Sequence, residues 1–190
     1  MPITFARQCL MATLLPVLAA CVAPATGGPT VTTAGALVDT PPIVPVALRA
    51  PADQTLLLKA LATGVQIYTC AANAQDNAFA WRFDAPEATL LDGSGKTIGK
   101  HYAGPTWEAN DGSKVVGQIE ARDPGTDPGA IAWLRLSANA HSGSGLMTRV
   151  KSILRLHTAA GAPPSANCAR VNANQVVRVP YTASYYFYGS

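Results

Sequence analysis

Residues of the kinds that bind ligands or transfer protons gather in one short stretch and one later loop. They are His101, Tyr102, Trp107, Glu108 and Asp111, followed by His141. Imidazole with carboxylate is the set that a metal site or a general acid–base pair requires. Tryptophan and tyrosine rings can instead stack on a sugar, whose hydroxyls donate hydrogen bonds to carboxylates. We predict a site for a small ligand or glycan, with no catalytic residue, metal or cofactor assigned, at His101, Tyr102, Trp107, Glu108 and His141.

The same residues also have an explanation that involves no ligand. Trp107 would then be an aromatic residue of the core or its rim, and Glu108 would bond to backbone at a kink made by Pro105. Asp111 would belong to the hairpin turn that Asn-Asp-Gly predicts at this point, and His141 would cap a loop. This interpretation stays open beside the first.

A third interpretation is an envelope hydrolase or a metal-dependent enzyme. It would use His101, Glu108 and His141 as its acid, base or ligand groups. The chain has three histidines, so a three-histidine metal site would also need His157 to converge with the other two. An enzyme should lose activity when His101 is replaced by alanine, whereas a binding protein should leave its ligand unchanged.

One motif resembles a nucleotide-binding site but is incomplete. Gly95-Lys96-Thr97 matches the end of a P-loop, but the glycine that the motif needs five residues before Gly95 is Leu90. A P-loop also needs a helix after it, whereas the residues from Thr97 alternate like a strand. The net charge of +3 is spread along the chain without a run of Lys or Arg, so we predict no nucleic-acid partner.

The segments that must position these residues have the pattern of short strands. Apolar and polar residues alternate with period two in several runs, and Gly, Asn, Asp and Pro separate them. An aromatic run, residues 181–188, ends the chain. Roughly eight to ten strands and no helix predict an all-β domain, either a sandwich or a barrel.

One run, residues 146–157, divides between an apolar and a charged face. Side chains two positions apart share a face of a strand. One face would hold Leu146, Val150, Leu154 and Leu156, and the other Arg149, Lys151, Arg155 and His157. The pattern predicts a strand with two distinct faces.

The N-terminus has the order of a secretory signal. An apolar run of about 12 residues, too short for the roughly 20 of a membrane-spanning helix, follows a short segment with one positive charge. Leu18-Ala19-Ala20-Cys21 resembles a bacterial lipobox, in which Cys21 is acylated after cleavage. We predict a signal peptide over 1–20, a Pro/Ala/Thr-rich tether over 21–50 and one domain over 51–190. The protein would be attached to a membrane through this lipid. Inner-membrane lipoproteins usually carry Asp after the acylated cysteine, so Val22 at that position favours the outer membrane.

The four cysteines divide between processing and structure. Cys9 would leave with the signal peptide, and Cys21 would carry the lipid. Cys70 and Cys168 remain, and two cysteines left in an exported domain usually pair. Two free buried thiols are the alternative to this predicted disulfide.

Several longer segments resemble a known family. They are Gly64–Cys70, Trp81–Leu90, His101–Glu108, Asp111–Gly117 and Val179–Tyr188. Over about residues 50–188 the chain resembles domain-of-unknown-function family 3455, and the resemblance implies a secreted β-rich domain without implying an activity. We therefore expect an exported cell-envelope lipoprotein with a β-rich binding or structural domain.

Overall fold

The structure, a computed structural model, describes residues 40–190 except 166. Its main elements are eight strands: β1 (Thr55–Ala72), β2 (Phe79–Leu91), β3 (Thr97–Tyr102), β4 (Thr106–Ala109), β5 (Lys114–Asp123), β6 (Trp133–Ser142), β7 (Val150–Ala160) and β8 (Val176–Gly189). Three short 3₁₀ turns complete the described elements: η1 (Val46–Leu48), η2 (Leu146–Arg149) and η3 (Arg170–Asn172). The described residues contain no helix that is long and apolar enough to cross a membrane.

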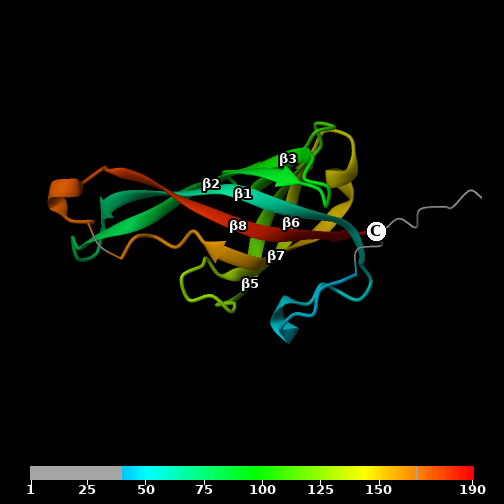
Figure 1. The fold of residues 1–190 in the computed structure, drawn as a ribbon, viewed down its shortest axis with the longest axis horizontal. Helices are drawn as coiled ribbons and strands as arrows, with labels where there is room; N and C mark the ends of the chain where they lie inside the picture. The colour runs from blue at the N-terminus through cyan, green and yellow to red at the C-terminus, as the bar shows by residue number, and fades with distance from the viewer. Residues whose placement is uncertain (1–39, 166) are drawn as a thin grey trace, which may run out of the picture. The chain divides into compact units, whose positions relative to one another are not determined.

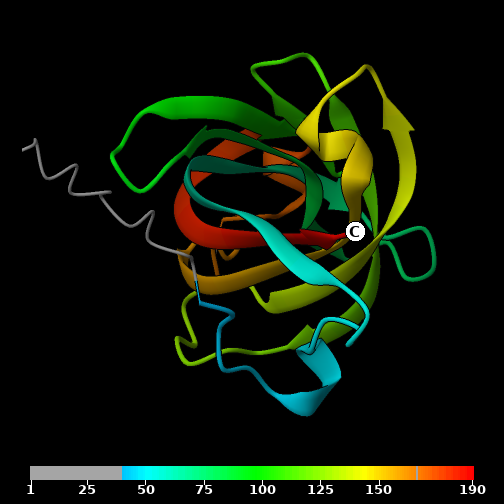
Figure 2. The ribbon, with the colours of Figure 1, turned by 90° about the vertical axis from the view of Figure 1, so that its right-hand side faces the viewer.

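The eight strands form one closed barrel in chain order, as Figures 1 and 2 show. Each strand is antiparallel to its neighbours, and β8 returns to pair with β1 from Thr55↔Gly189 to Thr69↔Val176. Closure satisfies the backbone groups that an open sheet would leave at its two edges. The predicted all-β class is confirmed, and of the two predicted architectures the barrel is the one observed.

Three strands continue beyond the barrel. The pairing of β2 with β3 ends at Ala88↔His101, and that of β7 with β8 ends at Ala160↔Tyr181. Beyond these points β1, β2 and β8 pair only with one another, and they form the three-stranded extension on the left of Figure 1. On one side of this extension, β2 therefore has no partner strand.

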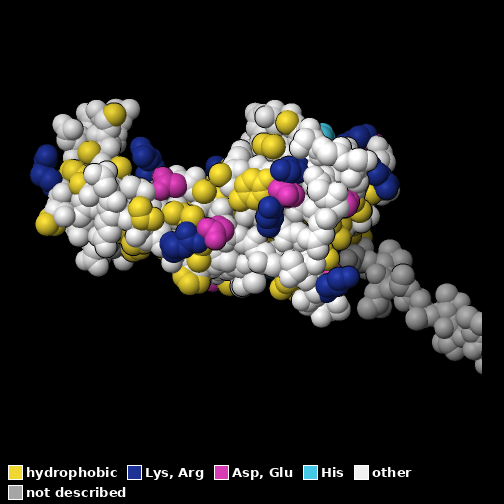
Figure 3. Space-filling view, turned by 90° about the horizontal axis from the view of Figure 1, so that it is seen from above, with side chains coloured by type: hydrophobic (Ala, Val, Ile, Leu, Met, Phe, Trp, Pro, Cys, Tyr) yellow, Lys and Arg dark blue, Asp and Glu magenta, His cyan; other side chains and the backbone are white. Residues whose placement is uncertain are grey.

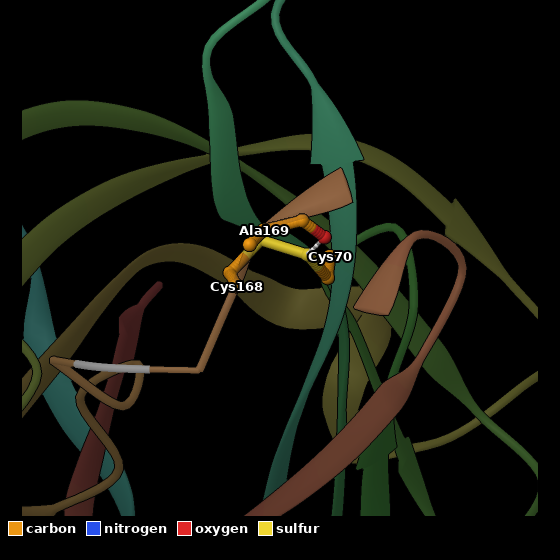
Figure 4. Close-up of a disulfide and its surroundings, with 3 residues drawn as sticks. All are labelled: Cys70, Cys168 and Ala169. Atoms are coloured by element: carbon orange, nitrogen blue, oxygen red, sulfur yellow. Dashed lines mark hydrogen bonds between the residues drawn. A yellow bond between two sulfur atoms is a disulfide. The ribbon is translucent and has the colours of Figure 1, made fainter. Parts of the chain in front are cut away.

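A disulfide joins Cys70, near the end of this extension, to Cys168 in the connection between β7 and β8. Figure 4 shows how the bridge holds the connection against β1. Backbone hydrogen bonds support the same contact, because the Cys70 amide donates to the Gln175 carbonyl and the Asn174 amide donates to the Cys70 carbonyl, both at 2.9 Å. This bridge is the disulfide that was predicted from the sequence.

The apolar residues form two clusters, one inside the barrel and one outside it. The inner cluster contains Trp107, Ile153, Tyr185 and Phe187. The outer cluster packs β7 and β8 beneath the segment that contains η1, and its buried members are Leu48, Leu154, Leu156, Tyr186 and Tyr188. Leu48, in the last part of the predicted tether, is thus buried on the outer face of the domain. The predicted signal peptide and Cys21 lie outside the described residues.

Both faces of β7 are covered. Leu154 and Leu156 belong to the outer cluster, whereas Arg155 pairs with Tyr185 and lines a hollow inside the barrel. Val150, which the pattern placed on the same face as the two leucines, belongs to the inner cluster, because the register shifts between Val150 and Ser152. Apolar character therefore does not identify the inner face of this strand.

Candidate ligand-binding cavity

A row of paired residues crosses the inner wall of the barrel and includes two of the predicted site residues. His101 pairs with Ala88 on one side and with Trp107 on the other, and Trp107 pairs with Val115. Residues directly opposite each other in a sheet share a face. His101 and Trp107 are accordingly only 2% and 1% exposed.

The His101 and Trp107 rings form a stack against the aromatic residues of β8. Their centroids lie 4.4 Å apart with an interplanar angle of 11°. The Tyr185 ring meets both of them edge-on, at 5.1 Å and 5.3 Å. Gly117 leaves room for the indole, because a Cβ there would lie 2.9 Å from a Trp107 ring carbon. Neighbouring strands thus hold the stack in one orientation.

This stack lines a cavity of about 250 Å³. Most of the wall is apolar, and its residues are Phe83, Asp84, Pro86, His101, Gly104, Pro105, Trp107, Ile119, Leu134, Leu136, Arg155 and Tyr185. A second hollow of about 370 Å³ shares Phe83, Ile119, Leu134 and Arg155 with the first and adds Gln66 to its wall. Phe83 and Ile119 are 49% and 38% exposed although they line both hollows. These two residues therefore mark the opening to solvent, beside the extension where β2 has no second partner strand among the described residues.

His101 is a neutral ring with a defined tautomer. Its Nδ1 lies 2.9 Å from the Thr106 carbonyl oxygen, which can only accept, so Nδ1 carries the proton. Nε2 is then the acceptor of the ring. Burial lowers the pKa of His101 to about 3, the hydrogen bond to Thr106 raises it only in part, and the charge of Arg155 lowers it further. His101 thus contributes a hydrogen-bond acceptor rather than a cation.

Several hydrogen-bond donors of the interior lack a protein partner in normal hydrogen-bond geometry. Among the described residues, Trp107 Nε1 is buried without a partner. Gln66 Nε2 and the hydroxyls of Tyr181 and Tyr185 also form no hydrogen bond of normal geometry, although they interact with one another and, at Tyr185, with Arg155. Desolvation raises the pKa of both tyrosines, so their hydroxyls keep their protons. Nearly all buried polar groups in folded proteins are hydrogen-bonded, to protein or to something else. The unpaired Trp107 Nε1 and the poorly bonded Tyr185 hydroxyl, both on the cavity wall, therefore favour a partner from outside the chain.

Arg155 lies where the two hollows meet. Its Nε and Nη2 donate to the Ala132 carbonyl oxygen at 3.1 Å and 2.8 Å. In the part of the chain that the structure describes, no carboxylate lies within ion-pair distance of this guanidinium. The cavity thus holds a positive charge whose protein partner is a neutral carbonyl.

The other predicted site residues on β3 and β4 lie on the outer face. The Tyr102 hydroxyl donates to Glu108 Oε2 at 2.8 Å. Glu108 also forms ion pairs with Lys100 at 3.4 Å and Lys114 at 3.2 Å, its two cross-strand neighbours. The Tyr102 hydrogen bond, followed by the two lysines, lowers the pKa of Glu108. Figure 3, which views the molecule from above in Figure 1, shows such acidic and basic side chains side by side on the surface.

His141 and Asp111 support loops in the structure. His141 Nε2 lies 2.7 Å from the Val150 carbonyl oxygen, and His141 is not among the residues that line the cavity. Asp111 accepts hydrogen bonds from Ser113 and from the Leu146 amide. No group of three or more His, Cys, Asp or Glu residues that could hold a metal ion occurs in residues 40–190 without 166.

The structure thus brings together His101 and Trp107 and separates them from Tyr102, Glu108 and His141. Sequence reasoning missed Arg155 and Tyr185 as residues of the cavity wall. Their pairing across β7 and β8 places them there, and no local motif marks that pairing. An aromatic residue opposite an arginine becomes recognisable only when the two strands are known to be neighbours.

An eight-stranded antiparallel barrel with an internal cavity belongs to the class of small barrels that can enclose one small ligand. The chain belongs to the family described as Protein of unknown function (DUF3455), whose model matches residues 51–189. No curated protein and no solved structure matches the chain.

Proposed function

We propose that this protein is an exported lipoprotein of the cell envelope whose barrel binds a small, mainly apolar ligand. The observation that carries the binding proposal is an apolar cavity whose wall includes two buried donors, Trp107 Nε1 and the Tyr185 hydroxyl, that lack a hydrogen bond of normal geometry. A purely structural barrel would gain stability by filling this space with apolar side chains, because empty space and unpaired polar groups both cost free energy. A ligand would supply the missing contacts.

The alternative enzyme has less support. Of its three residues, His101 lines the cavity, Glu108 is held on the outer face by lysines, and His141 is bonded to the Val150 carbonyl. An acid–base pair needs both groups within reach of one substrate. The placement of these side chains favours a binding protein.

Binding can be tested with N-phenyl-1-naphthylamine, a neutral apolar fluorophore. We expect saturable fluorescence enhancement with the wild-type barrel. Leu134→Trp should abolish it, because Leu134 lines both hollows and a larger side chain would fill them. Leu61→Trp adds the same side chain at an exposed position and should leave binding unchanged. A folded Leu134→Trp variant that binds the fluorophore as the wild type does would contradict the proposal.

The lipoprotein half of the proposal rests on the lipobox that ends at Cys21. In bacterial cells grown with radiolabelled palmitate, the wild-type chain and Cys9→Ser should take up label, and Cys21→Ser should not. Acyl chains each add about 0.8 kcal/mol per buried methylene, so several chains hold a protein to a bilayer durably. Cys21→Ser should consequently leave the membrane fraction or keep its signal peptide. Equal labelling of the two serine variants would refute the anchor.

A further inference from the structure

Resting on the proposed function, we infer that the cavity binds an apolar monocarboxylic acid, with its carboxylate on the guanidinium of Arg155 and its apolar body along the His101–Trp107 stack. The inference names the chemical class of the ligand. It depends on the hydrogen-bond donors that line the cavity and on the lack of a buried carboxylate among the described residues.

The first argument is the charge of Arg155. Charged side chains inside proteins are almost always paired with an opposite charge. Arg155 donates to the Ala132 carbonyl oxygen through Nε and Nη2 and interacts with the Tyr185 hydroxyl, and neither partner is an anion. A guanidinium presents donors in a planar fork that matches the two oxygens of a carboxylate. Arg155 therefore has both an unmet charge and free donors for such a group.

The second argument is the shortage of acidic groups around Arg155. No Asp or Glu is among the buried residues in the described part of the chain. Asp84 lines the cavity, but it is exposed and its carboxylate accepts a hydrogen bond from Thr69, with no ion pair to Arg155. The protein thus leaves the place of the counter-ion open.

The third argument is the polarity of the neighbouring atoms. Tyr185 is fully buried and paired with Arg155 across the strands, and its hydroxyl lies beside Tyr181 and Arg155 without a hydrogen bond of normal geometry. Trp107 Nε1 is buried without a partner. Both can donate to a carboxylate oxygen. One guanidinium suits a single negative charge, and the apolar wall suits a hydrocarbon or aromatic body.

The experiment compares acids with the alcohols of the same skeleton. Isothermal titration at pH 7.5 would measure decanoate against 1-decanol and 1-naphthoate against 1-naphthol, which also distinguishes a chain from a ring body. We expect the wild-type barrel to bind at least one acid about ten-fold more tightly than its alcohol, since hydrogen bonds to charged groups contribute about 1.5–3 kcal/mol. Arg155→Met should remove this difference and leave alcohol binding unchanged. Arg178→Met, at an exposed arginine paired with Glu87, is the matched control and should behave as the wild type.

The possible failures are distinguishable. If the wild type binds each alcohol as tightly as its acid, or binds the naphthylamine but neither acid, the carboxylate inference is overturned and the binding barrel stands. If the wild type binds none of these compounds, the proposed function fails as well. The comparison of acid with alcohol needs only the wild type, so it remains decisive even if Arg155→Met does not fold.

Discussion

His101 and its neighbour Tyr102 show how one residue step along a strand separates the interior from solvent. His101 is buried against Trp107, whereas Tyr102 lies on the outer face and bonds to Glu108. The imidazole and the carboxylate, which looked in sequence like an acid–base pair, thus lie on opposite sides of the sheet. The chemistry that remains inside is a neutral acceptor, unpaired donors and the charge of Arg155.

Burial of His101 should make the stability of the fold depend on pH. The pKa of His101 is about 3 in the folded protein against 6.5 for the exposed group, so between these values the unfolded chain binds a proton that the folded one does not. Stability should therefore fall as the pH decreases from about 6.5 towards 3, by up to about 1.4 kcal/mol per pH unit from this residue. His101→Phe should lose less stability than the wild type between pH 7 and pH 4.5, measured by urea unfolding.

A control must separate this effect from general destabilisation. Val115→Ala truncates a fully buried neighbour in the same row without removing a titratable group. It should lower the free energy of unfolding at every pH and keep the wild-type pH dependence. If His101→Phe and the wild type lose the same free energy on acidification, the histidine does not carry the effect.

The extension of β1, β2 and β8 carries a disulfide near its far end. Its far end carries the connection between β7 and β8, in which Val171 is 88% exposed, and Val176 at the start of β8 is 56% exposed. Such a segment buries little apolar surface. The disulfide between Cys70 and Cys168 and two backbone hydrogen bonds attach it to β1.

Removing this disulfide should reduce stability substantially. The bridged cysteines are 98 residues apart, and loss of a native disulfide typically costs about 2–5 kcal/mol because the unfolded chain gains conformational freedom. Cys70→Ser with Cys168→Ser should show this loss in urea unfolding under oxidising conditions. Under reducing conditions the difference in free energy of unfolding between this variant and the wild type should become small. Labelling of two thiols in the denatured, non-reduced wild type would contradict the bridge.

At the scale of the whole domain, closure of the sheet creates the cavity. Because β8 pairs with β1, the inward-facing residues of all eight strands surround one space. Eight strands make a barrel whose interior either fills with side chains or holds one small ligand. Here Met147 and Phe187 belong to the cluster that fills part of the interior, and the hollows beside Arg155 occupy another part.

The sequence alone could predict the local features of this protein. Alternation with period two and clusters of turn residues indicated an all-β domain, and a strand was expected from Thr97, where β3 begins. Such signals depend on residues close together in the chain, so they survive without knowledge of the fold. The family resemblance over residues 50–188 agrees with the match over 51–189.

Only the tertiary structure decided which face of each strand is the inner one. In β7 the apolar Leu154 and Leu156 face outwards beneath η1, and Arg155 faces inwards beside Tyr185. A period of two separates the faces but does not label them when both are covered. The inward face is set by pairing between strands far apart in sequence. For that reason His101 and Trp107 could be named as candidates from the sequence. The sequence did not show that Arg155 lies in the same cavity or that Glu108 lies outside it.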